Sequence, residues 1–216
     1  MLDRIYRIGH DCFRIEATEA AFDKYHQVNG KVTIYTDPFH LPDSLPKADL
    51  VLISHDHFDH CSPEDLEKIA KKETIYLAPG ACKAKLSKLP GSVQIVSPSQ
   101  KTQVYGIEVE VVPAYNTNKK FHPKESGHVG YVFSVEGKKI YFAGDTDRIP
   151  EMKAIRCDIA LLPVSGTYVM TAREAVEAAK DLGSPIVIPM HYGDIVGTEN
   201  DPKEFAKFYP GKTEIK

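Results

Sequence analysis

The chain lacks several features that mark secreted, membrane-spanning or redox proteins. Its 216 residues include only four cysteines (Cys12, Cys61, Cys82 and Cys157), and none are spaced as CxxC. Four such cysteines are too few for a disulfide scaffold, so we expect reduced thiols in a cytoplasmic protein. No apolar run approaches the ~20 residues of a membrane span, and the N-terminal segment has no apolar signal-peptide core.

The chain also lacks an excess of basic residues. Its formal net charge is −3, with 42% hydrophobic and 26% charged residues. A chain of this balance has no overall positive field, so we expect neither nucleic acid nor an anionic membrane as a partner. We expect a small-molecule substrate instead. The sequence gives no indication of the oligomeric state. No repeat, low-complexity segment or long linker divides the sequence, so residues 1–216 are predicted to form one domain.

Turn and helix-start signals divide the chain into a β-rich part and mixed parts. Residues 5–8 and 12–15 flank Gly9-His10-Asp11 and predict a hairpin, and Asn29-Gly30 predicts a turn before a strand. Strands are predicted over 31–36, 48–53, 74–77, 93–96, 104–112, 129–135, 139–143, 159–164 and 186–190. Helices are predicted after Ser62, after the capping box Thr171–Glu174 and from Asp201, with shorter ones over 81–89 and 150–155. This order predicts an α/β fold, a four-layer αββα sandwich of two packed sheets with helices outside.

One stretch, SHDHFDHC from Ser54 to Cys61, places three histidines and two aspartates directly after the apolar run 50–53. Imidazole nitrogens and carboxylate oxygens are ligands that zinc, iron and manganese accept. In an extended segment residues i and i+2 point the same way, so His55 and His57 can hold one ion. The turn that follows can direct Asp59 and His60 toward a second ion. The alternative, a solvated polar loop, has no need of this density of metal-binding groups.

Two other apolar strands end in groups of the same kind. Asp145 follows the strand predicted over 139–143, and His191 follows the strand over 186–190. Either residue alone has a structural reading, Asp145 as a turn or helix cap and His191 as a packed histidine. Together with the histidine cluster they favour a shared site, because open α/β sheets place their ligands just beyond the strand ends.

These residues resemble the motifs of the metallo-β-lactamase superfamily: HDHFDH (His55 to His60), GDTD around Asp145, and PMHYG around His191. The resemblance covers nearly the whole chain and implies an αββα sandwich with a dinuclear site in the groove between the sheets. The segments IGHDCFRIE, TDPFH and AYN are similar to the branch that holds ascorbate-6-phosphate lactonase and N-acyl-phosphatidylethanolamine phospholipase D. His10 and His40 lie in these shared segments, and we expect supporting or structural roles for both.

The sequence departs from the superfamily pattern at one expected ligand. Many members carry a metal-binding histidine in the strand end before the GDT strand, and here that place is Asn116. Asparagine is a weak zinc ligand, and His122 lies six residues further on and could reach back. His128 directly precedes a predicted strand and is expected to be structural. The first ion is therefore held by His55 and His57 with either Asn116 or His122, and a mononuclear site is an open alternative.

The resemblance implies that Asp59, His60 and His191 hold the second ion and that Asp145 bridges the two. Zinc is the expected metal, with manganese, iron and nickel as alternatives. The expected reaction is hydrolysis of a small ester, lactone or phosphodiester by a metal-bound hydroxide, with Asp59 also acting catalytically on the nucleophile or its proton. Three other readings remain: a mononuclear iron oxygenase or redox protein on the same fold, a metal-dependent nuclease, and a non-catalytic metal-binding module.

Two loops are candidates for contacts with the substrate. The segment from Asn116 to Lys124 contains Lys119, Lys120 and Lys124, and it could receive an anionic group such as a phosphate or carboxylate. An ordinary solvated lysine loop explains it equally well. The segment from Ser165 to Tyr168 follows another apolar strand and could line the same groove.

Overall fold

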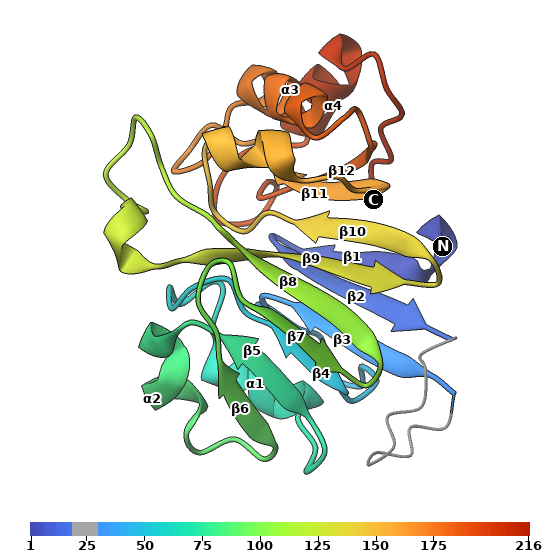
Figure 1. The fold of residues 1–216 in the computed structure, drawn as a ribbon, viewed down its shortest axis with the longest axis vertical. Helices are drawn as coiled ribbons and strands as arrows, with labels where there is room; N and C mark the ends of the chain where they lie inside the picture. Colours follow the sequence, from blue (N-terminus) through green and yellow to red (C-terminus); the bar gives the residue numbers. More distant parts are fainter. Residues whose placement is uncertain (19–29) are drawn as a thin grey trace.

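Two six-stranded sheets, packed face to face, form the centre of the molecule (Figure 1). The structure is a computed structural model, and it describes residues 1–18 and 30–216. The turn predicted at Asn29-Gly30 therefore lies partly outside the described residues, because Asn29 is not among them. With helices on the outer sides, this arrangement confirms the predicted αββα sandwich of the metallo-β-lactamase type.

The first sheet has its strands in the order of the sequence. They are β1 (Ile5–Gly9), β2 (Cys12–Ala17), β3 (Val32–Thr36), β4 (Leu50–Leu52), β5 (Ile75–Ala78) and β6 (Ser92–Ile95). The hairpin β1–β2 and the pair β2–β3 are antiparallel, whereas β3 to β6 run parallel. Because parallel neighbours share an edge at their carboxyl ends, the segments after β3 and β4 emerge at the same edge.

The second sheet repeats this plan, again with its strands in the order of the sequence and the antiparallel strands first. Its strands are β7 (Lys101–Val104), β8 (Ile107–Pro113), β9 (Val129–Val135), β10 (Lys138–Phe142), β11 (Ile159–Pro163) and β12 (Ile186–Met190). The strands β7 to β10 are antiparallel, and β10, β11 and β12 run parallel. The carboxyl ends of β10 and β12, which lead to Asp145 and His191, therefore lie at one edge of this sheet.

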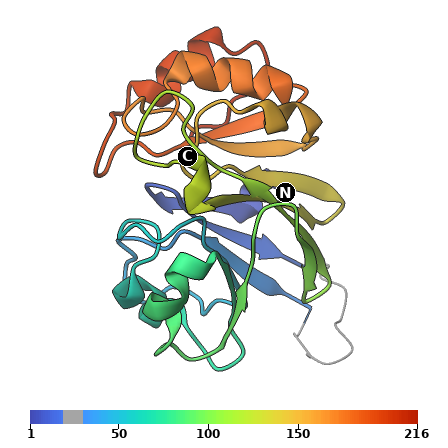
Figure 2. The same ribbon diagram turned by 60° about the vertical axis from the view of Figure 1, so that its left-hand side comes forward.

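Helices cover the outer face of each sheet (Figures 1 and 2). On the first sheet, α1 (Pro63–Ile69) buries Leu66 and Ile69 against Val51 and Tyr76. Fully burying a side chain of this size stabilises the fold by about 1.5–3 kcal/mol. The other α-helices are α2 (Lys83–Leu86), α3 (Ala172–Asp181) and α4 (Asp201–Phe208), and the 3₁₀ helices are η1 (Leu2–Arg4), η2 (Gly80–Cys82), η3 (Lys124–Ser126) and η4 (Pro150–Ala154). In the described part of the chain, no helix combines the length and apolarity needed to cross a membrane.

The two sheets are joined by hydrogen bonds as well as by their apolar faces. The buried hydroxyl of Tyr131 in β9 donates to the carbonyl oxygens of Ile53 (2.7 Å) and Leu77 (3.0 Å) in the first sheet. The N–H of Val129 donates to the carbonyl oxygen of Ser54 at 3.0 Å. These bonds fix the start of the histidine cluster against the second sheet.

Most predicted elements are present, with differences in detail, such as a 3₁₀ helix over Pro150–Ala154 and only Lys83–Leu86 as α-helix within 81–89. The strand predicted over 104–112 is β8 but begins later, at Ile107, and Val104 is the last residue of a separate strand, β7, that was not predicted. The last helix begins at Asp201 as predicted, but Asn200, and not Asp201, occupies its N-cap position. The caps predicted at Ser62 and at Thr171 are confirmed, because both side chains accept the expected backbone N–H.

Candidate metal centre

The segment from Ser54 to Cys61 leaves the end of β4 and turns back within one helical turn. The N–H groups of His60 and Cys61 both donate to the carbonyl oxygen of His57, at 3.2 and 2.9 Å. The turn brings the His55 ring to 4.5 Å from the His57 ring and 4.1 Å from the His60 ring, between centroids. His55 and His60 are buried and His57 is exposed. The three imidazoles of this cluster therefore lie side by side, from the interior of the protein to its surface.

Three histidines form the first group of candidate ligands. One ring nitrogen from each of His55, His57 and His122 lies within 4.8 Å of the other two. His55 Nε2 and His57 Nδ1 are 3.0 Å apart. The structure thus brings together the predicted pair His55 and His57, and it adds His122 from the loop after β8.

Asn116 supports His122 and does not belong to that group. Its Oδ1 accepts the backbone N–H of His122 at 3.0 Å and faces His122 Nδ1 at 3.2 Å. The backbone N–H of Asn116 donates to the His122 carbonyl oxygen at 2.7 Å, and its Nδ2 donates to the carbonyl oxygen of Tyr168 at 2.9 Å. Of the two predicted alternatives, the geometry therefore favours His122 as the ligand, with its Nε2 turned inward.

A second group is built around Asp145. Its Oδ2 lies 3.2 Å from Nε2 of His191 and 3.5 Å from Nε2 of His60. Asp59 Oδ2 lies 3.6 Å from the same His60 nitrogen. Asp145 Oδ2 is also 3.2 Å from Nε2 of His122, so this one oxygen lies between the two groups. The six predicted ligands are thus brought together in space, and their metal-binding roles stay predictions.

In His55, His60 and His191, the outward-facing nitrogen of the buried imidazole has a partner. Such partners fix the ring orientation and leave the inner nitrogen free, as is usual for metal-binding histidines. The pairs are His55 Nδ1 with Ser54 Oγ (2.8 Å), His60 Nδ1 with Asp37 Oδ2 (2.8 Å) and His191 Nδ1 with Ser165 Oγ (2.9 Å).

Several inward-facing polar atoms are buried and have no hydrogen-bond partner among the described residues. They include Nε2 of His60, Nε2 of His122 and Oδ1 of Asp145. Leaving a buried polar atom without a partner costs about 1–3 kcal/mol, so native proteins rarely do so without a reason. Neutral nitrogens and a carboxylate oxygen that face one small space fit a divalent cation, and this donor set therefore suits the predicted metals.

Burial and nearby charges set the ionisation states of these groups in the metal-free protein. Burial lowers the pKa of His60 to about 3 and holds that of His55 well below its usual range, so both imidazoles are neutral. Burial alone would lower the pKa of His191, but the carboxylates of Asp145 and Asp11 raise it to about 9. Burial would raise the pKa of Asp145, but His191 and His60 hold it well below its usual value. Without metal, a charged His191 therefore accompanies a charged Asp145.

Sequence reasoning missed Asp37 and undervalued His10. Asp37 accepts hydrogen bonds from the backbone N–H (2.7 Å) and the hydroxyl of Ser54, and it faces His60 Nδ1. Nε2 of His10 lies 3.4 Å from Oδ2 of Asp59, a member of the second group. Both residues are fully buried polar groups, and each directly follows a predicted strand or lies in the turn after one, in TDPFH and IGHDCF, which is the signal that could have identified them.

The remaining histidines differ in position. His128 is buried and packs its ring against that of His55 at 4.7 Å between centroids, outside the groups of candidate ligands. His40 lies away from the two groups, where its Nδ1 pairs with Asp194 Oδ2 at 3.1 Å. These positions agree with the supporting or structural roles expected for both.

The basic loop is partly neutralised by neighbouring acids. Lys119 Nζ lies 2.6 Å from Asp147 Oδ1, and Lys124 Nζ lies 2.9 Å from Glu151 Oε1. Two of the three lysines therefore have local carboxylate partners. The predicted anionic group on the substrate stays a prediction with less support than the sequence alone suggested.

A cavity of about 440 Å³ opens directly over the candidate ligands. Its floor contains His57, Asp59, His122 and Asp145, and its rim consists of Phe58, Phe121, Tyr168 and Ile195. The exposed fractions of the rim side chains are 65%, 55%, 40% and 40%, so four of the nine exposed large hydrophobic residues in the described chain gather here. The Phe121 and Tyr168 rings are in edge contact at 4.4 Å between centroids. The candidate ligands are thus reached through an apolar mouth.

Comparisons with known proteins agree with this geometry. Residues 4–191 match the family model described as a beta-lactamase superfamily domain. A UPF0173 metal-dependent hydrolase of Thermoplasma volcanium is 32% identical over 209 residues, covering 91% of this chain and 86% of the relative. The crystal structure of a proposed metal-dependent hydrolase from Parabacteroides distasonis has a TM-score of 0.80 and 32% identity, covering 98% of this chain and 91% of that one. The metallo hydrolase Igni18 of Ignicoccus hospitalis shares the fold, with a TM-score of 0.74, 24% identity and coverages of 98% and 94%.

Proposed function

We propose that this chain, which belongs to the beta-lactamase superfamily and is a metal-dependent hydrolase, acts at a centre of two divalent cations. The proposed reaction is the cleavage of a small ester, lactone or phosphodiester. His55, His57 and His122 would hold the first cation. Asp59, His60 and His191 would hold the second, and Asp145 would bridge the two. Zinc is the proposed metal, and the same nitrogen and oxygen donors also suit manganese, iron and nickel.

The observation that carries this proposal is the position of one oxygen. Asp145 Oδ2 lies within 3.5 Å of an Nε2 atom in each of the two histidine groups. A carboxylate between two sets of imidazoles supports two cations that share a ligand. A non-catalytic module would use a closed ligand set, whereas here His57 and Asp59 border an open cavity.

Divalent cations bound here would supply Lewis acidity, which lowers the pKa of a bound water and stabilises an oxyanion. Asp59 is the residue placed to hold or move a proton beside that water. Burial would raise the pKa of Asp59, but contacts with His10 and His60 lower it, so its carboxylate is anionic. Its side chain borders the cavity floor, where a substrate would meet it.

The rim of the cavity supports a substrate with an apolar group beside the bond that is cleaved. Phe58, Phe121 and Tyr168 expose aromatic surface around the entrance, and burying such surface favours binding by about 25 cal/mol per Å². An acyl chain or an aromatic leaving group would contact these rings while the carbonyl or phosphoryl centre reaches the floor. The rim therefore selects for the apolar part, and the floor supplies the chemistry common to all three substrate classes.

The first test is the metal content of protein purified without chelator or added metal, followed by activity assays on aryl esters, lactones and aryl phosphodiesters. Two equivalents of zinc or manganese per chain, with activity lost on chelation and restored by the metal, is the expected result. One equivalent of iron with oxygen consumption would favour the oxygenase alternative. Full activity in metal-stripped protein would overturn the proposal.

The apolar rim is tested by Phe121→Ala assayed against a series of esters with increasing acyl length. We expect KM to rise roughly tenfold for the longest acyl chain, and little for acetate, because only the former buries the Phe121 ring. Phe208→Ala removes an exposed phenylalanine from the end of α4 and serves as the matched control. An equal change in KM for short and long esters would exclude a substrate-binding role for the rim.

A further inference from the structure

We propose that His10 is a further ligand of the second cation, beside His60 and His191. This inference rests on the proposed metal centre and extends it by one residue, which neither the histidine cluster nor the strand-end pattern includes. It gives the second cation a three-imidazole face, completed by the carboxylates of Asp59 and Asp145.

His10 is held in place by the tight turn between β1 and β2. Its backbone has φ of +43°, a left-handed conformation that is uncommon for a residue with a side chain. This conformation directs the imidazole inward, and the residue is fully buried. Its carbonyl oxygen accepts the backbone N–H of His191 at 3.3 Å, and His191 also has a positive φ of 60°. The two turns that carry these imidazoles are thus fixed to each other.

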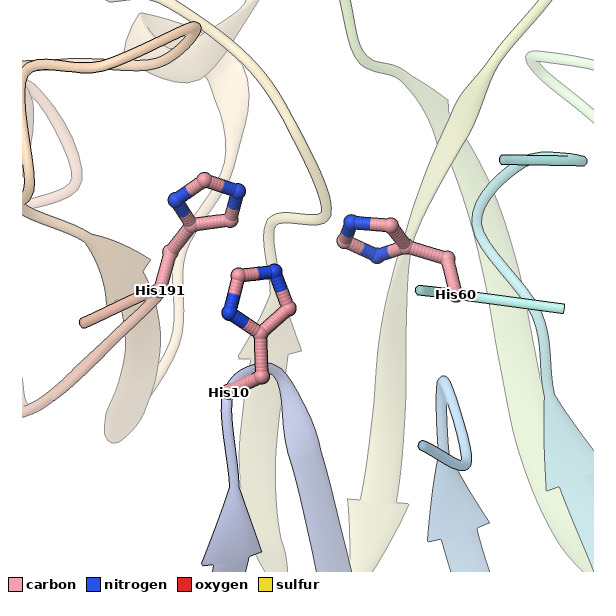
Figure 3. Close-up of side chains that lie close together, drawn as sticks. All are labelled: His10, His60 and His191. Atoms are coloured by element: carbon pink, nitrogen blue, oxygen red, sulfur yellow. The ribbon is translucent and has the colours of Figure 1, made fainter. Parts of the chain in front are cut away.

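The three rings face one another across a small space. Ligand nitrogens of His10, His60 and His191 all lie within 4.8 Å of one another. The His10 ring centroid is 4.3 Å from that of His191 and 5.3 Å from that of His60. Figure 3 shows one nitrogen of each ring turned toward the shared space, although the rings come from three separate parts of the chain. A cation in that space would meet imidazoles from both sheets.

The hydrogen bonding of His10 differs from that of an ordinary buried histidine. Neither of its ring nitrogens has a hydrogen-bond partner among the described residues, although both are buried. Buried imidazoles normally satisfy at least one nitrogen, and strained backbone positions persist where function requires them. A cation beside His60 and His191 would give one of these two buried nitrogens a partner and would account for the uncommon backbone conformation that turns the ring inward.

A different role for His10 would be to orient Asp59. Nε2 of His10 lies 3.4 Å from Asp59 Oδ2, which is close enough for an N–H group to attract that carboxylate. The two roles make different demands on the side chain. An amide at the same place can donate to Asp59, but it is a weak ligand for zinc or cobalt, so substitution separates the roles.

The experiment measures binding of Zn²⁺ and Co²⁺ alone to the full chain and to two variants. His10→Asn keeps a residue that tolerates the left-handed backbone, and His10→Gln keeps an N–H donor near the position of Nε2. We expect both variants to keep the first cation and to lose affinity for the second by roughly 10–100-fold or more, since even indirect partners of metal ligands have effects of that size. We also expect the visible absorption of the Co²⁺-loaded protein to change, because it depends on ligand number.

His40→Asn is the matched control, because His40 also lies in a loop with positive φ but pairs with Asp194 outside the two groups. It should bind both cations as the unmodified protein does. Circular dichroism and thermal unfolding show whether each variant is folded before binding is compared.

Unchanged affinity and an unchanged Co²⁺ spectrum in folded His10→Asn would overturn the inference and leave the proposed function intact. Loss of the second cation in His10→Asn but not in His10→Gln would assign His10 to the orientation of Asp59 and also overturn it. Absence of any bound cation in the unmodified chain would overturn the proposed function and this inference together.

Discussion

Asn116 occupies the place of an expected ligand but supports its neighbour instead. We expect Asn116→Ala to weaken binding of the first cation by roughly 10–100-fold, because the backbone N–H and ring of His122 lose the oxygen that positions them. Titration with zinc in the presence of a competing chelator measures this. Asn118→Ala, in an exposed part of the same loop, is the control and should bind normally. An effect of equal size in both variants would show that loop order, and not this hydrogen bond, is responsible.

His191 gives metal binding a pH dependence of predictable sign. Its pKa is raised to about 9 in the metal-free protein, so the charged form is present below that pH and must lose a proton before its nitrogen can bind metal. His60, with a pKa of about 3, is already neutral. We therefore expect release of at least one proton per chain at pH 8, decreasing as the pH rises past 9. Calorimetry in two buffers of different ionisation enthalpy measures it, and no release at pH 8 would contradict the assignment.

The sequence alone could predict the candidate ligands that lie close together along the chain. His55, His57 and His60 are separated by a few residues, and Asp145 and His191 each follow an apolar strand, so spacing and strand ends were enough. The choice of His122 over Asn116 depends on a loop that closes through backbone hydrogen bonds, for which spacing carries no signal. The approach of His10 to His191 depends on contact between the two sheets and was equally hidden.

The segment between β10 and Asp145 shows how an element end controls a ligand. Gly144 has φ of +61°, and a Cβ atom there would lie 2.7 Å from Ser54 Cβ and 2.9 Å from the Val129 carbonyl oxygen. Gly137, in the turn between β9 and β10, has φ of +71° and no atom within 4 Å of that position. The two glycines share the conformational requirement, and Gly144 alone of this pair adds close packing against the first sheet.

We expect Gly137→Ala to cost about 1–2 kcal/mol of unfolding free energy, because alanine disfavours the left-handed region. Gly144→Ala should cost roughly 1–3 kcal/mol more, because the added methyl overpacks the contact with Ser54 and Val129. It should also weaken metal binding by displacing Asp145. Urea unfolding of the metal-free variants and zinc titration measure the two effects. Equal losses of unfolding free energy in the two variants would mean that the contacts of Gly144 with Ser54 and Val129 accommodate a methyl group without strain.

The turn between β7 and β8 explains why the strand predicted from Val104 begins only at Ile107. Tyr105 and Gly106 both have positive φ, at 51° and 78°, as a two-residue hairpin turn requires. The usual sequence signal for such a turn is Asn-Gly or Asp-Gly, and tyrosine at the first position reads as a strand residue. Tyr105 is buried, so packing and not local preference places the turn there.

At the level of the whole molecule, the pattern of strands and helices predicts the layers but not which strand ends meet. Each sheet carries part of the centre: the first supplies the segments after β1 and β4, and the second supplies those after β8, β10 and β12. The groups come together only when the sheets pack, fixed by bonds such as Tyr131 to Ile53. The packing of the two sheets could be predicted from the resemblance to the superfamily, but not from the residue patterns alone.

Because the centre joins both sheets, removal of the metal should affect the stability of the entire fold. A ligand at about 1,000 times its Kd stabilises the folded state by about 4 kcal/mol per site, provided that the unfolded chain does not bind it. For a chain of this size, each 1 kcal/mol corresponds to about 2–4 °C in Tm, so chelation should lower Tm by about 8–16 °C for each such site.

Differential scanning calorimetry with and without a chelator tests this, and Asp145→Asn provides the matched control. That variant keeps the shape of the side chain but loses the charge shared by the two groups, so its Tm should be low and insensitive to chelator. The metal-free protein carries buried groups without partners, such as Nε2 of His60 and Oδ1 of Asp145, and these oppose folding until a cation binds them. An unmodified protein whose Tm is the same with and without chelator would show that the sheets hold together without help from this centre.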